Sequence, residues 1–381
     1  MKRLLLVGAG HAHAQVLKDW IFAPVPGCEL TIVSPHAMTP YSGMVPGWLA
    51  GSYRFDEIGI DFAALATAAG AKFLVDELIG LDPKRRLVRL RGGSALDYDV
   101  LSLNVGSTLT PPAAPPGKAL RILSLRPLDK LRQAWDELLG DPQLATLDTP
   151  LTVTAVGGGA AGVESLLAAL QRLRALRPGR TVQGTMITAS ATLLPGLAPA
   201  AVRSAHAALA AAGVAVQTGR DYDDSVAGSS DIVLWATGAQ AHPWQSGCGL
   251  AVSDRGFIRV DRRLRSCSHP QVHAVGDCAE WQAPLPKAGV FAVRMGPVLS
   301  RNLRAALGAG TAAAFVPQRR YLALLATADG RAIGSWGGWS LTGRWLWHWK
   351  DRIDRAFVRR FANAGPSLAP NHRTPVPGEP V

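Results

Sequence analysis

Residues 4–13, LLLVGAGHAH, decide the fold, because they place a glycine turn directly after a short apolar run. The run at residues 4–7 predicts a buried strand, and the residues from 11 to 20 have helical character. A second apolar strand is expected over residues 29–33. This strand, turn, helix and strand order is typical of a Rossmann unit, whose parallel strands are buried on both faces.

The first glycine turn predicts a site for a dinucleotide pyrophosphate. Gly8 permits the tight turn, and Gly10 lets the backbone approach the phosphates. The start of the following helix adds free N–H groups and a positive dipole end. His13 stands where the pattern usually has a third glycine or alanine. A GxGxx pattern alone can be an ordinary tight turn, but its place between two strands favours nucleotide binding.

The same pattern recurs about 150 residues later and predicts a second nucleotide-binding unit. A strand at 151–156 runs into the full fingerprint Gly157-x-Gly159-x-x-Gly162, followed by an Ala/Leu-rich helix and a strand at 182–188. The acid that usually binds an adenosine ribose is missing from both units, which have Ser34 and Ala189-Ser190 there. No arginine adjoins Ala189 to mark a 2′-phosphate site, which favours NADH over NADPH.

Composition limits the other possibilities. The 381 residues carry 40 basic and 28 acidic side chains, a formal charge of +12 that favours an anionic partner such as nucleotide phosphates or an acidic membrane surface. No nucleic-acid-binding module is recognisable. The four cysteines are irregularly spaced, which argues against a metal site and suits a reducing compartment. With no long apolar run and no room for a signal peptide, we expect a cytoplasmic protein, either free or on the inner face of the membrane.

A third motif resembles a known family. The stretches GFIRVD at 256–261 and HPQVHAVGDCA at 269–279 resemble the closing FAD motif of the pyridine nucleotide-disulfide oxidoreductase superfamily. The resemblance implies that Asp277 binds the ribityl and pyrophosphate region of the flavin. Leu103-Asn104-Val105-Gly106-Ser107 and Ala236-Thr237-Gly238 resemble two further motifs of that family.

The expected fold class is α/β, with two Rossmann-like dinucleotide-binding domains and a C-terminal aromatic and basic region. We expect the FAD domain at 1–110 and 241–310, interrupted by a linker and crossover at 111–150 and an NAD(P)H domain at 151–240. The C-terminal region is expected at 311–365, and a mobile tail at 366–381.

The resemblance implies two sets of cofactor contacts. For FAD these are Gly8, Gly10, His11, His13, Ser34, Pro35, Ser42, Gly43, Val75, Asn104, Val105, Gly106, Gly276, Asp277, Lys287, Ala288, Gly289 and Phe291. For NADH or NADPH they are Gly157, Gly159, Ala160, Ala161, Gly162, Glu164, Ala236, Thr237 and Gly238.

Two residues are candidates for catalytic roles. Glu164 resembles the family's acid near the nicotinamide, and the alternative is an ordinary helical glutamate that faces solvent. Lys287 falls where the family's chain crosses the flavin ring, and its ammonium could stabilise reduced flavin there. The alternative for Lys287 is a surface lysine. His11 and His13 either flank the flavin or pack in the core, and their spacing does not suit a metal.

The stretch TPYSGMVPGW at 39–48 lacks the cysteine pair of the disulfide reductases, so a dithiol relay there is excluded. The remaining resemblance is to the type II NAD(P)H:quinone oxidoreductase branch, in a subgroup with the flavoprotein domains fused to selenophosphate synthetase. It implies hydride transfer from NAD(P)H to FAD and electron transfer to a quinone. Three alternatives stay open: a soluble reductase with a protein or metabolite acceptor, which could be linked to selenium; a non-catalytic FAD-binding adaptor; and, less favoured, sulfide oxidation involving Cys278.

The C-terminal region concentrates aromatic and basic side chains. Five of the eleven tryptophans lie between residues 336 and 349. A helix over 345–361 would have one apolar face and a basic opposite face, as an interfacial membrane helix requires. The apolar face comprises Trp345, Leu346, Trp349, Ile353, Ala356, Phe357 and Phe361, with Lys350 and Arg360 expected to snorkel, and the basic face comprises Arg352, Arg355 and Arg359. The alternative is packing on the protein's own core or on a homodimer partner.

Overall fold

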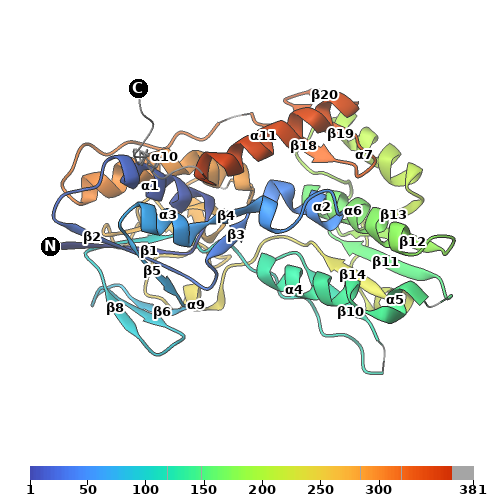
Figure 1. The fold of residues 1–381 in the computed structure, drawn as a ribbon, viewed down its shortest axis with the longest axis horizontal. Helices are drawn as coiled ribbons and strands as arrows, with labels where there is room; N and C mark the ends of the chain where they lie inside the picture. The colour runs from blue at the N-terminus through green and yellow to red at the C-terminus, as the bar shows by residue number, and fades with distance from the viewer. Residues whose placement is uncertain (118, 147, 284, 319, 363–381) are drawn as a thin grey trace, which may run out of the picture.

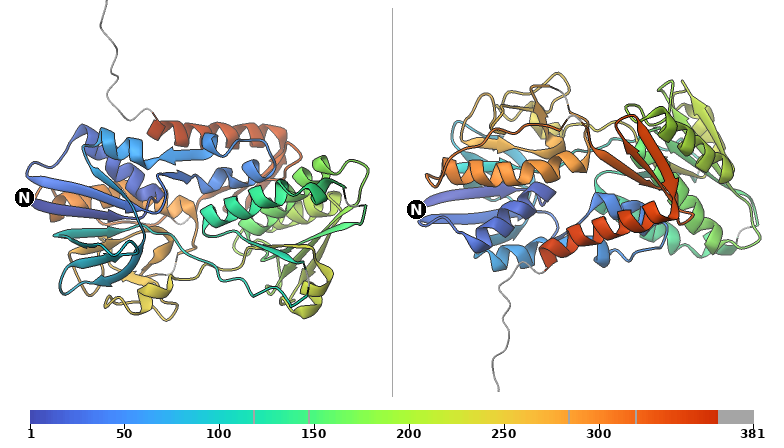
Figure 2. Two further views of the ribbon diagram at one scale, coloured as in Figure 1. Left: turned by 60° about the horizontal axis from the view of Figure 1, so that its bottom comes forward. Right: turned by 90° about the horizontal axis from the view of Figure 1, so that it is seen from above.

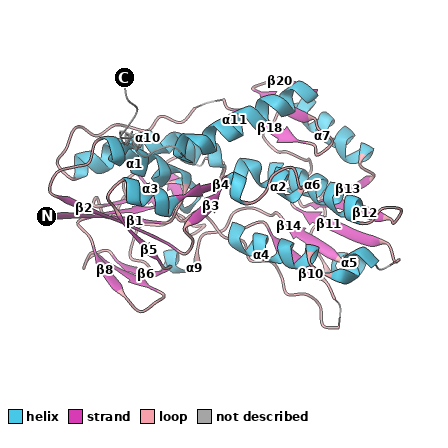
Figure 3. Ribbon diagram, viewed as in Figure 1, coloured by secondary structure: helices cyan, strands magenta, loops and turns pink. Residues whose placement is uncertain are grey.

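The computed structural model describes residues 1–362 apart from residues 118, 147, 284 and 319. The expected tail at 366–381 therefore lies outside the described residues. The described chain forms two parallel five-stranded sheets that lie side by side, with helices against both (Figures 1 and 3). This arrangement confirms the expected α/β class with two Rossmann-like units.

The first sheet has the strand order β16-β9-β1-β2-β5, and all of its pairs are parallel. Its strands are β1 (Lys2–Val7), β2 (Cys28–Ser34), β5 (Lys72–Val75), β9 (Val100–Leu103) and β16 (Val272–Ala274). β16 follows the whole second sheet in sequence, so the first unit is completed only after the second has been inserted.

Side chains of β1 alternate between two cores, as the pleat of a strand requires. Leu4 and Leu6 face a helical layer made of α1 (His11–Phe22), α3 (Phe62–Ala68) and α10 (Gly289–Ala306). Leu5 and Val7 face the opposite core. That core is closed by an antiparallel sheet of β6 (Leu78–Asp82), β7 (Leu87–Leu90) and β8 (Ala95–Asp97), and by the pair β15 (Ile258–Val260) and β17 (Ala279–Trp281).

The second sheet has the order β10-β14-β11-β12-β13 and is also parallel throughout. Its strands are β10 (Arg121–Ser124), β11 (Leu151–Val156), β12 (Val182–Thr188), β13 (Val214–Thr218) and β14 (Ile232–Trp235). The helices of this part are α4 (Leu128–Leu139), α5 (Pro142–Thr146), α6 (Ala160–Leu176), α7 (Pro199–Ala211), α8 (Asp224–Ser229) and α9 (Pro243–Ser246). Because β10 pairs with β14, we propose that the second unit begins at β10, inside the stretch expected as a linker.

A connection between β2 and β5 reaches from the first unit to the second. It contains β3 (Met38–Pro40), η1 (Ser42–Met44), α2 (Val45–Leu49), η2 (Asp56–Ile58) and β4 (Gly59–Asp61), and α2 packs against α6. The short helix η3 (Gly276–Cys278) follows β16. Through these segments, residues of the first unit come to lie next to residues of the second.

The C-terminal region consists of an antiparallel sheet of β18 (Leu322–Ala326), β19 (Ala332–Trp336) and β20 (Trp339–Gly343), followed by α11 (Arg344–Ala362). The helix is the one expected at 345–361, and it packs against β4 and against the sheet that precedes it (Figure 2). It spans from the second unit to the first, where Phe361 joins the core of α1 and α10.

The inward face of α11 differs from the expected apolar face. Its buried residues are Leu346, Lys350, Asp354, Val358 and Phe361. Trp345, Trp349 and Ile353, expected to share the buried or membrane face, are 56%, 42% and 40% exposed. The expectation that Lys350 snorkels to solvent is wrong. Lys350 is buried and forms an ion pair with Asp354, one turn further along the helix. A pattern of apolar residues does not predict this ion pair.

Candidate functional site

A cavity of about 2250 Å³ opens between the two sheets, at the carboxyl ends of their parallel strands. This edge is where open α/β sheets bind ligands. The volume exceeds the ~300–1,000 Å³ of a site for one small molecule. The predicted residues that line it are Gly8, Gly10, His11, Ser34, Pro35, Ser42, Gly43, Val75, Asn104, Val105, Gly106, Asp277, Lys287, Ala288 and Gly289, with Gly157, Gly159, Ala160, Ala161, Glu164, Ala236, Thr237 and Gly238.

The first glycine turn is held against the strand end of β9. Gly8 has φ +94°, and a Cβ there would lie 2.5 Å from the Asn104 carbonyl oxygen. A Cβ on Gly10 would overlap the Asn104 side chain. The Asn104 amide oxygen accepts from the Ala12 N–H at 3.1 Å, and its amide nitrogen donates to the Val275 carbonyl at 3.0 Å. Asn104 thereby fixes the start of α1 to the ends of β9 and β16.

His13 does not line the cavity and lies beneath the turn, fully buried. Its Nδ1 lies 2.6 Å from the Gly8 carbonyl oxygen, which can only accept, so Nδ1 carries the proton. Nε2, 2.8 Å from the Ser102 hydroxyl, then accepts from that group. Burial lowers the pKa of His13 to about 4, so the ring is neutral. The alternative that His13 packs in the core is the one the geometry favours.

His11 lines the cavity and differs from His13 in its partners. Its ring contacts Tyr41 and Phe357, with centroids 5.3 and 5.8 Å away. Burial also lowers the pKa of His11 to about 4. Its buried Nε2 has no hydrogen-bond partner among the residues that the structure describes.

The second glycine turn leaves open space for a ligand. Gly157 has φ +119° and meets the Ala236 carbonyl, so it permits the turn. A Cβ on Gly159, at the N-terminus of α6, would have no neighbouring atom within 4 Å among the described residues. Gly162 does not line the cavity, because it packs against the Gly157 carbonyl oxygen. Gly157 thus permits the turn, Gly159 leaves space for a ligand and Gly162 allows close packing of the helix, as the fingerprint predicts.

Glu164 lies on the cavity wall and not on a solvent-facing side of α6. One of its carboxylate oxygens accepts from the Ala326 N–H at 2.8 Å. Burial raises the pKa of Glu164 to about 7, the charge of Lys350 acts to lower it, and that of Asp354 acts to raise it. This carboxyl can therefore hold or release a proton near neutral pH.

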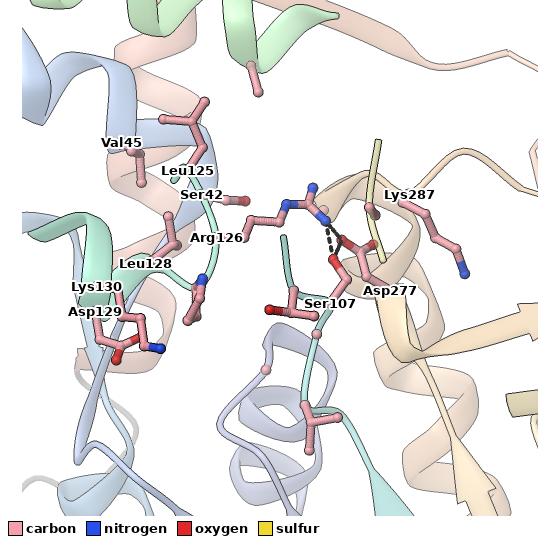
Figure 4. Close-up of a pocket in the computed structure, with 18 of the residues that line it drawn as sticks. Ser42, Val45, Ser107, Leu125, Arg126, Leu128, Asp129, Lys130, Asp277 and Lys287 are labelled. Carbon is pink, nitrogen blue, oxygen red and sulfur yellow. Dashed lines mark hydrogen bonds and ion pairs between the residues drawn. The ribbon is translucent and has the colours of Figure 1, made fainter. Parts of the chain in front are cut away.

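Asp277 lies at the cavity, and an arginine from the other unit reaches it. The Asp277 Oδ2 atom accepts from Arg126 at 2.5 Å and from the Ser107 hydroxyl at 3.4 Å (Figure 4). Arg126 also donates to the Ser107 hydroxyl. Arg126 lies between β10 and α4, and nothing in the sequence marked it as a site residue.

Lys287 lines the cavity, but its ammonium is turned away from Asp277 (Figure 4). Its Nζ donates to the Ala279 carbonyl at 2.5 Å and lies 3.7 Å from the centroid of the Phe257 ring. Burial lowers the pKa of Lys287. Contact between this ammonium and a flavin is a proposal, and the observed partners of the ammonium are Ala279 and Phe257.

Two further predicted contacts, Gly276 and Phe291, lie behind the cavity wall. Gly276 has φ +70° and sits against the Asn104 amide. Phe291 is buried in the core of α1 and α10, with its ring 5.7 Å from that of Tyr321.

Charged residues lie beside the ends of β2 and β12, in the segments that follow the neighbouring strands β5 and β13. Asp76 and Glu77 follow β5 and line the cavity beside Ser34. Arg220 and Asp221 follow β13, and the Arg220 N–H donates to the Thr188 carbonyl at 3.0 Å. No arginine adjoins Ala189 in the sequence, but parallel pairing of β12 and β13 brings Arg220 close to Ala189 in the fold, where its backbone contacts Thr188.

None of the four cysteines lines the cavity. Cys278, next to Asp277, is fully buried, and its thiol donates to the Val275 carbonyl at 3.3 Å. Burial raises the pKa of the Cys278 thiol to about 11, which makes a thiolate unfavourable at neutral pH. Among the described residues, no group of three or more His, Cys, Asp or Glu could hold a metal ion.

Comparisons with known proteins agree with this geometry. The model of the pyridine nucleotide-disulphide oxidoreductase family matches residues 2–296. Ferroptosis suppressor protein 1 of Homo sapiens is 25% identical over 224 residues, 54% of this chain and 57% of that protein. The chain thus matches little more than half of that relative's length. The same-named protein of Taeniopygia guttata is 22% identical over 307 residues, 74% of this chain and 75% of that protein.

A solved structure shows the same fold. The sulfide:quinone oxidoreductase of Aquifex aeolicus superimposes with a TM-score of 0.76 at 16% identity, covering 96% of this chain and 93% of that one. The likeness includes the C-terminal region, since the matched part extends well beyond the family motifs.

Proposed function

Because the chain belongs to the pyridine nucleotide-disulphide oxidoreductase family, we propose that it transfers hydride from NAD(P)H to FAD and passes the electrons on to a quinone. It is a flavoprotein oxidoreductase with FAD as its cofactor and NADH or NADPH as its co-substrate.

The residues of the first unit fit a flavin dinucleotide. Gly8 and Gly10 line the cavity and let the turn pack closely against Asn104, where a Cβ would clash. The unpartnered Nε2 of His11 lies beside it, and Asp277 offers a carboxylate for hydroxyl groups. We propose that FAD lies along this line and that NAD(P)H lies over Gly157, Gly159 and Ala236–Gly238.

The chemistry of the acceptor step needs a proton as well as electrons. When bound, FAD supplies the redox chemistry, taking a hydride from the nicotinamide and giving one to the acceptor. A quinone that receives a hydride needs one further proton to become a quinol. The Glu164 carboxyl, with a pKa of about 7, can donate that proton, and it recovers it from water through the open cavity.

The observation that carries the quinone proposal is the double role of α11. Lys350, on its inner side, donates to the carbonyl of Gly43 in the cavity wall at 2.6 Å. Trp345 and Trp349, on its outer side, are exposed, with stacked rings 6.3 Å apart. Trp336, Trp339 and Leu341 in β19 and β20 are also exposed. One helix thus connects the redox cavity with an apolar surface that suits a lipid-soluble acceptor.

We propose that this surface contacts the membrane. Exposed Arg352 and Arg359 on α11 can interact with acidic lipids, while the tryptophans enter the interface. No helix in the described part of the chain is both long enough and apolar enough to cross a bilayer. The proposed contact is therefore peripheral.

An anaerobic titration tests the function. The purified yellow protein is reduced with NADH or NADPH, and a short-chain quinone is then added. We expect the visible flavin absorbance to bleach with the nucleotide and to return with the quinone. If the flavin absorbance returns only when a protein or another metabolite is added, that molecule and not a quinone is the acceptor. Failure of both nucleotides to bleach would overturn the catalytic function.

A further inference from the structure

Arg126 occupies a position that links the two nucleotide-binding units. It lies two residues after β10, the edge strand of the second sheet, and two residues before α4. Its guanidinium reaches Asp277, which follows the last strand of the first sheet. The ion pair crosses 151 positions of sequence and lies in the wall of the cavity (Figure 4).

The backbone around Arg126 is held in place from both sides. The Ser124 hydroxyl donates to the Arg126 carbonyl at 2.6 Å. The Leu125 N–H donates to the Trp235 carbonyl at 3.0 Å, and the Leu125 side chain is buried. The arginine therefore starts from a fixed point of the second sheet, and its direction toward Asp277 does not depend on a free loop.

The ion pair is largely shielded from solvent. The side chains of Arg126 and Asp277 are 30% and 18% exposed. Both described contacts of Arg126 with side chains, to Asp277 and to Ser107, use the Nη1 atom. A guanidinium has five N–H donors, so the rest of its donors can serve a ligand in the cavity.

We propose that Arg126 is a flavin-site residue with two effects. It fixes the Asp277 carboxylate in the orientation that binds the flavin's hydroxyl groups, and it places one positive charge from the second unit at the flavin. The proposal rests on FAD binding in this cavity but not on the identity of the electron donor or acceptor. Because reduction adds negative charge to the flavin site, a fixed cation there favours the reduced over the oxidised cofactor.

The test uses Arg126→Gln and Arg126→Lys, with Arg203→Gln as the control. Arg203 lies on α7 in the second unit, is exposed and does not line the cavity. Two quantities are measured without NAD(P)H or quinone. One is the FAD dissociation constant of the apoprotein, from flavin fluorescence, and the other is the midpoint potential of the bound flavin, from equilibration with a reference dye.

We expect Arg126→Gln to weaken FAD binding about tenfold or more, as loss of a charged hydrogen bond does. We expect reduced FAD to lose about tenfold more affinity than oxidised FAD, which lowers the two-electron midpoint potential by about 30 mV. Arg126→Lys keeps the charge and should hold the potential near the wild-type value while FAD binding weakens. The Arg203→Gln control should change neither quantity.

Wild-type affinity and potential in Arg126→Gln would overturn the proposal. A potential in Arg126→Lys that falls as far as in Arg126→Gln would overturn the role of the charge. Circular dichroism and thermal unfolding of each apoprotein separate these outcomes from misfolding. These measurements contain no electron acceptor, so they do not depend on quinone reduction. A protein that fails to reduce a quinone can therefore still support or contradict the role of Arg126.

Discussion

Lys350 and Asp354 form an ion pair one turn apart on α11, with 2.6 Å between Nζ and Oδ2 and side chains only 10% and 8% exposed. Lys350 also donates to the Gly43 carbonyl, so the pair anchors the C-terminal helix to the cavity wall. Its two charges have opposite effects on the pKa of Glu164. The C-terminal region is therefore electrostatically coupled to the redox cavity.

The first prediction uses this coupling. Lys350→Met removes a cation and should raise the pKa of Glu164 above about 7, whereas Asp354→Asn removes an anion and should lower it. If protonated Glu164 donates to the acceptor, flavin reoxidation slows as pH rises through this pKa. Stopped-flow reoxidation between pH 5 and 9 should show the midpoint moving to higher pH in the first variant and to lower pH in the second.

Glu164→Gln is the control for that experiment and should abolish the pH transition. If the midpoint stays near pH 7 in Lys350→Met and Asp354→Asn alike, the group that titrates is not Glu164.

The second prediction concerns acid stability and His13. Because burial lowers its pKa from 6.5 to about 4, the unfolded chain binds a proton as pH falls below 6.5 while the folded chain does not. The contribution of His13 to stability is present above pH 6.5 and is lost as pH falls toward 4. His13→Gln should cost roughly 1–3 kcal/mol in the free energy of unfolding at pH 7. The difference from wild type should shrink by up to about 2 kcal/mol at pH 5.

Urea unfolding at the two pH values measures this, with the exposed His206→Gln as the matched control. A wild-type-minus-variant difference that is equal at pH 7 and pH 5 would contradict the assigned neutral, buried state of His13.

The strands and both glycine turns could be predicted because their signals are local, and the place of Asp277 at the cavity agrees with the family motif that it resembles. An apolar run followed by Gly8 or Gly157 is visible within one stretch of sequence. Arg126, Asp76 and Arg220 left no comparable signal, because strand pairing alone brings them to the cavity. Lys350 and Asp354 show an ordinary i, i+4 spacing that usually marks a solvated helix face. Their burial depends on tertiary packing, in which Lys350 donates to the Gly43 carbonyl.

The third prediction compares Gly8 with Gly159, which occupy the two glycine turns. Gly8→Ala places a Cβ 2.5 Å from a backbone oxygen at φ +94°, so it should lower the thermal midpoint sharply and reduce the FAD content. Gly159→Ala meets open space and should leave the thermal midpoint within about 1–2 °C of wild type. Its methyl group projects into the space proposed for the NAD(P)H diphosphate. We therefore expect KM for NAD(P)H to rise about tenfold or more.

Gly247→Ala, at another position with open space and outside the cavity, should change neither stability nor KM. A Gly159→Ala protein with wild-type KM would place the nucleotide elsewhere.

The fourth prediction concerns the choice between NADH and NADPH. Arg220 lies beside Thr188 and Ala189, where the adenosine ribose is expected, and its guanidinium donates to the Ser225 hydroxyl at 3.0 Å. Asp221 lines the same part of the cavity. An arginine favours a 2′-phosphate, whereas a carboxylate favours a free ribose hydroxyl. We expect NADPH to be used, with Arg220→Ala lowering kcat/KM for NADPH about tenfold or more and leaving NADH within about twofold.

Asp221→Asn is the reciprocal variant and should affect NADH more than NADPH. Equal losses for both nucleotides in Arg220→Ala would show that the side chain contacts a group common to the two, such as the diphosphate.

The fifth prediction tests the proposed membrane surface without disturbing the cavity. Deletion of the C-terminal region would remove the hydrogen bond from Lys350 to Gly43 in the cavity wall, so point substitutions on the outer side of α11 are preferable. Trp345→Ser with Trp349→Ser removes exposed aromatic area but no buried contact of the inner face. Because Trp side chains contribute strongly to interfacial binding, partitioning onto phosphatidylglycerol vesicles should fall about tenfold or more.

The matched control is Phe22→Ser on α1, which replaces another exposed aromatic residue outside the C-terminal region. Co-sedimentation should fall only in the tryptophan variant, while FAD content and the reduction of a short-chain quinone stay at wild-type levels in both. If the wild type and the tryptophan variant co-sediment with the vesicles equally, the proposed peripheral membrane contact is contradicted, and the exposed tryptophans bind a different partner.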